Sequence, residues 1–150
     1  MSARGRAMAA AAAVVAAAAA VAGCGCAGGA ARPVDPPPPR TVQLNEPGAR
    51  VDVEAHVVPG YVTVVDFWAD YCGACVTVSG LLAVQTAGEP RVLIRKVDVG
   101  DGFTPVARTY EIGALPHFRI YDKHRRLRHI LVGNDTRDAA ALAGQLVAEP

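Results

Sequence analysis

The feature that most constrains the fold is a short β-branched run that leads directly into two closely spaced cysteines. Residues 62–67 have the composition of a buried strand. Cys72 and Cys75 follow, where we expect this strand to give way to a helix. At this spacing two thiols can close a small ring without rearranging the backbone. The sequence therefore predicts a strand–helix junction that carries a redox-active dithiol.

The two cysteines are expected to have different roles. Cys72 would lie at a helix N-terminus, where free N–H groups and the helix dipole favour a thiolate. Its thiolate is the expected nucleophile, and Cys75 would resolve the mixed disulfide. The alternative is a zinc site, because two of its four ligands can be cysteines at this same spacing. The chain has no second cysteine pair of this kind after residue 47, and its four histidines have no recognisable zinc spacing. Redox chemistry is therefore favoured, and no metal is expected.

The remaining pattern after residue 47 predicts alternating helices and strands. A helix is expected from Cys72 to about residue 85, with Leu81, Leu82 and Val84 as its apolar part. Further segments are a strand at 92–99, a short helix at 104–110, two strands at 118–121 and 128–132, and a last helix capped by Thr136 with Leu142, Leu146 and Val147 on one face. This order describes an α/β fold with a mixed sheet and helices on both faces.

The first 23 residues have the layout of a secretory signal. Arg4 and Arg6 precede an uncharged, alanine-rich run over residues 7–22, which is short for a spanning helix. The following Val-Ala-Gly-Cys24 resembles the lipobox of bacterial lipoproteins, which implies a signal peptide at 1–23 and lipidation of Cys24. Ordinary secretion with cleavage near residue 27 or 31, or a weak membrane anchor, is the alternative. Cys26 has no assigned role.

Residues 24–47 lack periodicity and include four consecutive prolines at 36–39. Such a run favours extended polyproline II, which suits a tether between a membrane and the domain at 48–150. A disordered leader without a selected length is the alternative. The net charge of +1 and the 5% aromatic content argue against a nucleic-acid binder.

From about residue 51 to 147 the sequence resembles the thioredoxin superfamily. The resemblance is carried by the segment 64–75, by Lys-Val-Asp-Val at 96–99, by the approach to Pro116 at 110–116, and by Gly133 before the last helix. It implies a thioredoxin-like three-layer sandwich, in which a mixed central sheet lies between helices on both faces.

The resemblance also implies roles for side chains near the dithiol. Asp66 matches a buried acid that helps to move the proton of the second cysteine, and burial would raise the pKa of its carboxyl. An exposed Asp at a strand end is the alternative. Lys96 matches a lysine that neighbours this acid, although a surface Lys96 is equally consistent with the sequence. The substrate groove would comprise Trp68, Tyr71, Gly73, Ala74, Leu115 and Pro116, with Pro116 in a cis peptide bond.

Four residues depart from the commonest family pattern, namely Tyr71 for tryptophan, Ala74 for proline, Val76 for a basic residue and His117 for a small hydroxyl residue. Residues between the cysteines tune the stability of the thiolate and hence the reduction potential, so the pattern here does not predict a strongly reducing protein. His117 would either supply a charge near the thiolate or face solvent, and the solvent-facing position is favoured.

Together these features predict an extracytoplasmic, lipid-anchored thiol–disulfide oxidoreductase that acts on protein cysteines through Cys72 and Cys75. It would face the periplasm of a bacterial cell envelope, with the outer membrane favoured because Gly25 is not acidic. Similarity to tethered family members in cytochrome maturation favours reduction over oxidation or isomerisation, and reduction there would need a membrane thiol relay. We expect a monomer without a cofactor. The alternatives are copper binding or delivery by the same dithiol, and a module whose disulfide is only structural.

Overall fold

In a computed structural model of the chain, residues 36–150 are described. The predicted signal peptide, Cys24, Cys26 and the first part of the predicted tether lie outside the described residues. Within residues 36–150, no helix is both long enough and apolar enough to span a bilayer.

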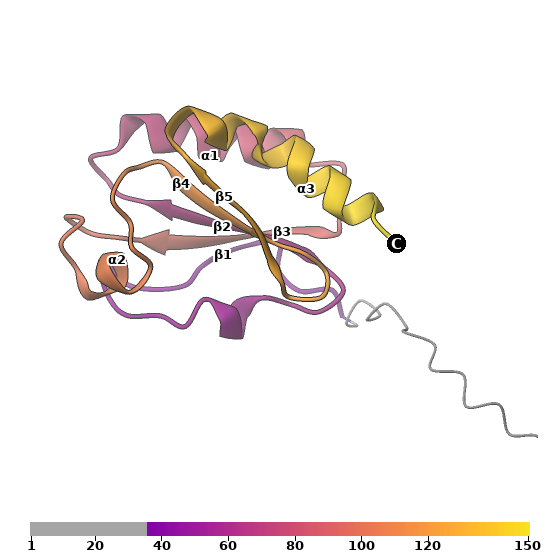
Figure 1. Ribbon diagram of the computed structural model, residues 1–150, viewed down its shortest axis with the longest axis horizontal. Coiled ribbons are helices and arrows are strands. Elements are labelled where there is room, and N and C mark those ends of the chain that lie inside the picture. Colours follow the sequence, from indigo (N-terminus) through magenta and orange to yellow (C-terminus); the bar gives the residue numbers. More distant parts are fainter. Residues whose placement is uncertain (1–35) are drawn as a thin grey trace, which may run out of the picture.

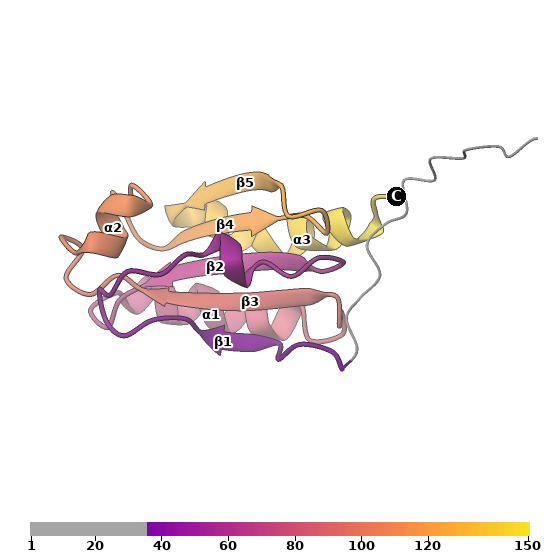
Figure 2. The same ribbon diagram turned by 90° about the horizontal axis from the view of Figure 1, so that it is seen from below.

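The centre of the fold is a five-stranded sheet in the order β1-β3-β2-β4-β5 (Figure 2). The strands are β1 (Thr41–Gln43), β2 (Val62–Trp68), β3 (Val92–Asp98), β4 (His117–Tyr121) and β5 (Leu127–Val132). The pairs β1–β3 and β3–β2 are parallel, whereas β2–β4 and β4–β5 are antiparallel. The sheet is therefore mixed, as the sequence predicts.

Helices cover both faces of this sheet (Figure 1). The helices α1 (Gly73–Gln85) and α3 (Ala139–Ala148) lie on one face, and α2 (Pro105–Thr109) and the short 3-10 turn η1 (Glu54–His56) lie on the other. Thr104 caps α2, because its hydroxyl accepts a hydrogen bond from the Ala107 N–H. This is the predicted three-layer sandwich.

Each face of the sheet has its own apolar core. On the α1 side, Val78 and Leu82 from α1 and Leu146 from α3 pack against β2, β3 and β4. On the α2 side, Phe67 of β2 packs with Tyr110 just after α2. Consecutive side chains of a strand point to opposite faces. Asp66, the neighbour of Phe67, therefore points into the α1 layer.

The fold begins earlier than the predicted boundary at residue 48. The edge strand β1 lies within the segment 24–47 assigned to the tether. Its start is fixed by Arg95, whose side chain is only 4% exposed. The Arg95 guanidinium donates to the carbonyls of Pro39 at 3.0 Å and His56 at 3.3 Å. A three-residue strand at a sheet edge has too little pattern to be recognised in the sequence.

Two predictions about helices are wrong in detail. Thr136 does not cap α3, because it lies buried inside the 3-10 turn η2 (Gly133–Asp138) and its hydroxyl donates to the Gly133 carbonyl. Val84 is 74% exposed and does not belong to the buried side of α1. That side is formed by Cys75, Val78 and Leu82, at the spacing of one helix face.

The two ends of the sheet differ in what they hold. Residue 36 and the C-terminus lie at the end where β2 and β3 begin (Figure 1). The helix α1 starts at the opposite end, to which the arrowheads of β2 and β3 point. The dithiol at the start of α1 is therefore far from both ends of the described chain.

Candidate active site

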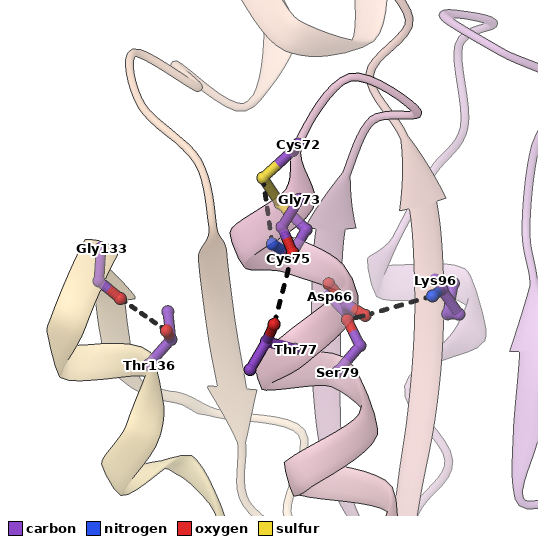
Figure 3. Close-up of a disulfide and its surroundings, with 9 residues drawn as sticks. All are labelled: Asp66, Cys72, Gly73, Cys75, Thr77, Ser79, Lys96, Gly133 and Thr136. Carbon is purple, nitrogen blue, oxygen red and sulfur yellow. Dashed lines mark hydrogen bonds and ion pairs between the residues drawn. A yellow bond between two sulfur atoms is a disulfide. The ribbon is translucent and has the colours of Figure 1, made fainter.

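Cys72 and Cys75 form a disulfide at the first turn of α1, with a sulfur–sulfur distance of 2.07 Å (Figure 3). Cys72 is the N-cap of the helix, and its Sγ accepts a hydrogen bond from the Cys75 N–H at 3.1 Å. Such a donor would stabilise a thiolate on Cys72 after reduction. Cys72 is 9% exposed and Cys75 is 1% exposed. The more exposed cysteine is thus the one at the helix N-terminus.

The strand β2 places this turn at the middle of the sheet. Trp68 ends the strand, and the Cys72 N–H bonds to the Ala69 carbonyl at 3.0 Å, which turns the chain toward α1. Ala69 is fully buried. Sites in α/β folds commonly form where the carboxyl ends of central strands meet helix N-termini. The sequence therefore builds the dithiol on rigid elements.

Asp66 lies beneath the disulfide with a fully buried side chain. Its Oδ2 accepts a hydrogen bond from the Ser79 hydroxyl at 2.5 Å and lies 3.6 Å from the Lys96 ammonium. Burial raises the pKa of the Asp66 carboxyl, and Ser79 and then Lys96 partly offset that rise. The prediction that Asp66 is buried is confirmed. Lys96 pairs with it through a side chain that is 27% exposed.

A cavity of about 300 Å³ connects these groups to the surface. Its lining includes Cys75, Asp66, Ser79, Lys96 and Trp68. The Lys96 ammonium lies 4.6 Å from the centre of the Trp68 ring, in a cation–π contact. The structure thus brings the resolving cysteine, the buried acid and the lysine to one space.

A second hollow, of about 530 Å³, is lined by Cys72. Tyr71, Phe103 and Leu115 contribute apolar surface to it, and Tyr71 and Phe103 are 66% and 82% exposed. The Leu115–Pro116 peptide bond is cis, as the resemblance implies. A third hollow, of about 460 Å³, is lined by Ala74, Leu115, Pro116 and Arg137, among others. Gly73 and Ala74 are exposed beside the disulfide.

The predicted position of His117 is wrong, because its side chain is 5% exposed and packs edge-on against Phe67 at 5.5 Å. Burial, and then the charge of Arg119, lower the pKa of His117 to about 4. His117 is therefore neutral near pH 7 and neither faces solvent nor supplies a charge. It lies at the first position of β4, and its side chain follows Arg119 and Tyr121 onto the α2 face.

Sequence reasoning missed two residues of the site, Ser79 and Phe103. Ser79 lies four residues after Cys75, which places both on one side of a helix, and that spacing could have identified it. No signal marked Phe103, because its exposure depends on the loop between β3 and α2. In residues 36–150, no three His, Cys, Asp or Glu side chains gather as a metal site.

A mixed sheet with a Cys-x-x-Cys disulfide at a central helix N-terminus defines a thiol–disulfide oxidoreductase of the thioredoxin fold. The chain matches the Thioredoxin family over residues 52–146 and belongs to that family.

Sequence relatives agree with this family. The thioredoxin of Coprinus comatus is 28% identical over 79 residues, which cover 51% of this chain and 74% of the relative. The thioredoxin of Chlamydia pneumoniae is 33% identical over 63 residues, or 42% of this chain and 60% of the relative.

Solved structures show the same fold. The chain is similar to reduced thioredoxin pre-protein from Schistosoma mansoni, with a TM-score of 0.56 and 25% identity over 72% of this chain and 99% of that one. It is also similar to oxidised thioredoxin O2 from Arabidopsis thaliana, with a TM-score of 0.58 and 22% identity over 72% and 95% of the two chains.

Proposed function

We propose that the protein is a lipid-anchored reductase of protein disulfides in a bacterial cell envelope, facing the periplasm. Residues 1–23 would be removed as a signal peptide, Cys24 would carry the lipid, and the following residues up to about 39 would form the tether. The observation that carries the redox part is the Cys72–Cys75 disulfide, with the more exposed cysteine at a helix N-terminus and a buried Asp66 beneath it. The sequence motif around Cys24 supports the anchor.

The proposed reaction has two exchange steps. The Cys72 thiolate attacks one sulfur of a substrate disulfide, forms a mixed disulfide and releases the other substrate sulfur as a thiolate. The Cys75 thiol then loses its proton and attacks the Cys72 sulfur, which releases the second substrate thiolate. The protein becomes the disulfide seen here, and two electrons have passed to the substrate. A membrane thiol relay would return two electrons to the protein.

Asp66 is the proposed base for the second step. Burial raises the pKa of its carboxyl, which suits it to exchange protons near neutral pH. It lines the same cavity as Cys75, so a proton has a short path between the two groups. Lys96 would stabilise the carboxylate through the contact at 3.6 Å.

The substrate is proposed to bind as an extended segment beside Cys72. The apolar hollow next to Tyr71 and Phe103 would receive a side chain near the substrate cysteine. Leu115 lines both this hollow and the one that contains Pro116 and Arg137. The exposed rings of Tyr71 and Phe103 present apolar surface to water, and a bound substrate side chain would cover that surface.

Reduction of insulin by dithiothreitol tests the activity. We expect the wild-type protein to accelerate insulin precipitation and Cys72→Ser to be inactive, with Cys26→Ser as the matched control that retains activity. Equal, negligible acceleration by the wild type and Cys72→Ser would refute a general reductase role.

Incorporation of labelled fatty acid tests the anchor. In a bacterial host, Cys24→Ser should lose the label and leave the membrane fraction, whereas Cys26→Ser should keep both. Label that persists in Cys24→Ser would refute the proposed lipidation site.

Copper binding through the same dithiol is the second candidate, supported only by the two adjacent sulfurs. Metal analysis of protein purified without oxygen separates it from turnover. Stoichiometric copper that is lost in Cys72→Ser would favour binding, and metal-free protein with reductase activity would favour the oxidoreductase.

A further inference from the structure

The two carboxylate oxygens of Asp66 have different surroundings. Oδ2 accepts the Ser79 hydroxyl at 2.5 Å and faces the Lys96 ammonium at 3.6 Å. Oδ1 is buried and has no hydrogen-bond partner within residues 36–150. In Figure 3, Ser79 and Lys96 approach one side of the carboxylate, and Cys75 lies on the other. A buried acceptor without a partner is costly and calls for an explanation.

Ser79 reaches the acid from the same helix that carries the resolving cysteine. It follows Cys75 by four residues in α1, so the two side chains lie one turn apart on one side of the helix. Both residues line the cavity of about 300 Å³ together with Asp66. The hydroxyl, the carboxylate and Cys75 therefore line one cavity that opens to the surface.

We infer that Ser79 is a positioning residue that holds Oδ2 of Asp66, so that Oδ1 is the oxygen that takes the proton of the Cys75 thiol. This rests on the role proposed above for Asp66 as the base. The proton moves from the Cys75 sulfur to Oδ1, the resulting thiolate attacks the Cys72 sulfur, and the substrate thiolate leaves. The proton then passes from Oδ1 through the cavity to solvent.

Ser79 also affects the protonation of the acid. A hydroxyl that donates to a carboxylate stabilises the charged form. Burial raises the pKa of Asp66, and the Ser79 hydrogen bond is the largest of the effects that lower it. Without this hydroxyl, the pKa of Asp66 should rise further, and the carboxylate should be less often available at neutral pH.

Reaction of the reduced protein with an excess of dithionitrobenzoate separates the two chemical steps. The first thionitrobenzoate is released when Cys72 attacks, and the second when Cys75 resolves the mixed disulfide. The variants are Ser79→Ala, Ser79→Thr and Asp66→Asn. Thr77→Ala is the matched control, because Thr77 lies on the same helix but donates to the Gly73 carbonyl instead.

We expect Ser79→Ala to slow the second release about tenfold at pH 7, which is roughly the effect of one hydrogen bond to a charged group. The midpoint of its pH profile should move to higher pH, while the first release is unchanged. Ser79→Thr should restore the profile because it keeps the hydroxyl. Thr77→Ala should match the wild type.

Two results separate the failure of this inference from the failure of the proposed function. If Asp66→Asn does not slow the second release, Asp66 is not the base, and the role of Ser79 falls with it. If Asp66→Asn slows the second release but Ser79→Ala leaves the rate and pH profile unchanged, only the role of Ser79 is refuted. Equal slowing of both releases in Ser79→Ala would indicate a structural effect and would also refute it.

A measurement without turnover gives a second readout. Carboxyl carbon NMR of the oxidised protein follows the titration of Asp66 directly. The pKa of Asp66 should be higher in Ser79→Ala than in the wild type and in Thr77→Ala. An unchanged pKa in Ser79→Ala would overturn the inference.

Discussion

Replacement of Asp66 by asparagine should stabilise the oxidised protein, and by an amount that depends on pH. Burial raises the pKa of Asp66 in the folded protein above its ordinary value of 3.8. The ordinary pKa applies to the unfolded state. Between it and the raised pKa of the folded state, the folded state binds more protons than the unfolded state, so the free energy of unfolding falls as pH rises. Asparagine is isosteric and does not ionise, so Asp66→Asn lacks this loss.

The magnitude follows from proton linkage. The difference in unfolding free energy between Asp66→Asn and the wild type should grow by about 1.4 kcal/mol for each pH unit above 3.8, until the folded pKa is reached. Above that pKa the difference should be constant. The contact with Lys96, which is 27% exposed, needs no separate correction, because it already lowers the folded pKa that sets this plateau.

Urea unfolding of both oxidised proteins from pH 3 to pH 9 measures this difference, and the pH at which it levels off gives the folded pKa of Asp66. Intact disulfides in both proteins keep the redox state fixed. A difference that is independent of pH, or one that favours the wild type at neutral pH, would refute the reasoning about the buried carboxylate.

Three further predictions concern other parts of the fold. The pKa of His117 is lowered from 6.5 to about 4, so the unfolded state binds more protons in that interval, and the unfolding free energy of the wild type should fall by about 3 kcal/mol as pH falls from 6.5 to about 4. In urea unfolding, His117→Leu should not show this fall. The same pH dependence in both proteins would contradict the prediction. Gly100 has a φ of +60°, and a Cβ there would lie 2.9 Å from Thr104 Cγ2, so Gly100→Ala should lower the unfolding free energy by about 1–2 kcal/mol. Gly113→Ala is the control, because a Cβ at Gly113 would meet open space. Equal losses in the two variants would show that the backbone at Gly100 is not the cause. Arg95→Ala should lower the unfolding free energy by about 2 kcal/mol, because it removes the charged donor of the hydrogen bonds to the Pro39 and His56 carbonyls. It should also speed amide exchange in β1, and unchanged exchange there would show that Arg95 does not hold this strand.

Local pattern and family resemblance together predicted most of the elements around the site. The strand before the cysteines, the helix after them and the α/β class follow from periodicity, because these segments are long and their apolar residues face one core. The edge strand β1 could not be predicted in this way, because three residues are too few to show a period. The contact that fixes its start joins Arg95 to the Pro39 carbonyl, and these two residues are more than 50 positions apart in the sequence. Thr136 failed as a cap because a 3-10 turn intervenes before α3.

From the residues alone, the chemistry of the site was predictable only where the sequence motif is local, and the family resemblance supplied Asp66, Lys96 and the cis bond at Pro116. Cys72 and Cys75 lie together in the chain, whereas the contact between Asp66 and Lys96 depends on the parallel register of β2 and β3. The same dependence on strand register explains why the buried position of His117 was not predicted. Which face of β4 carries this side chain depends on the pairing with β2, and a shift of one residue would have placed it on the α1 face instead.

The separation of the two ends of the sheet has a consequence for the reach of the enzyme. The described chain begins at the end opposite to the disulfide (Figure 1). If the protein is held through the residues before Pro36, the dithiol points away from the point of attachment. The length and stiffness of that segment would then set the effective concentration of the thiol at a given substrate disulfide. Lengthening or shortening it would change which substrates are within range, while the reactivity of Cys72 toward each of them stays the same.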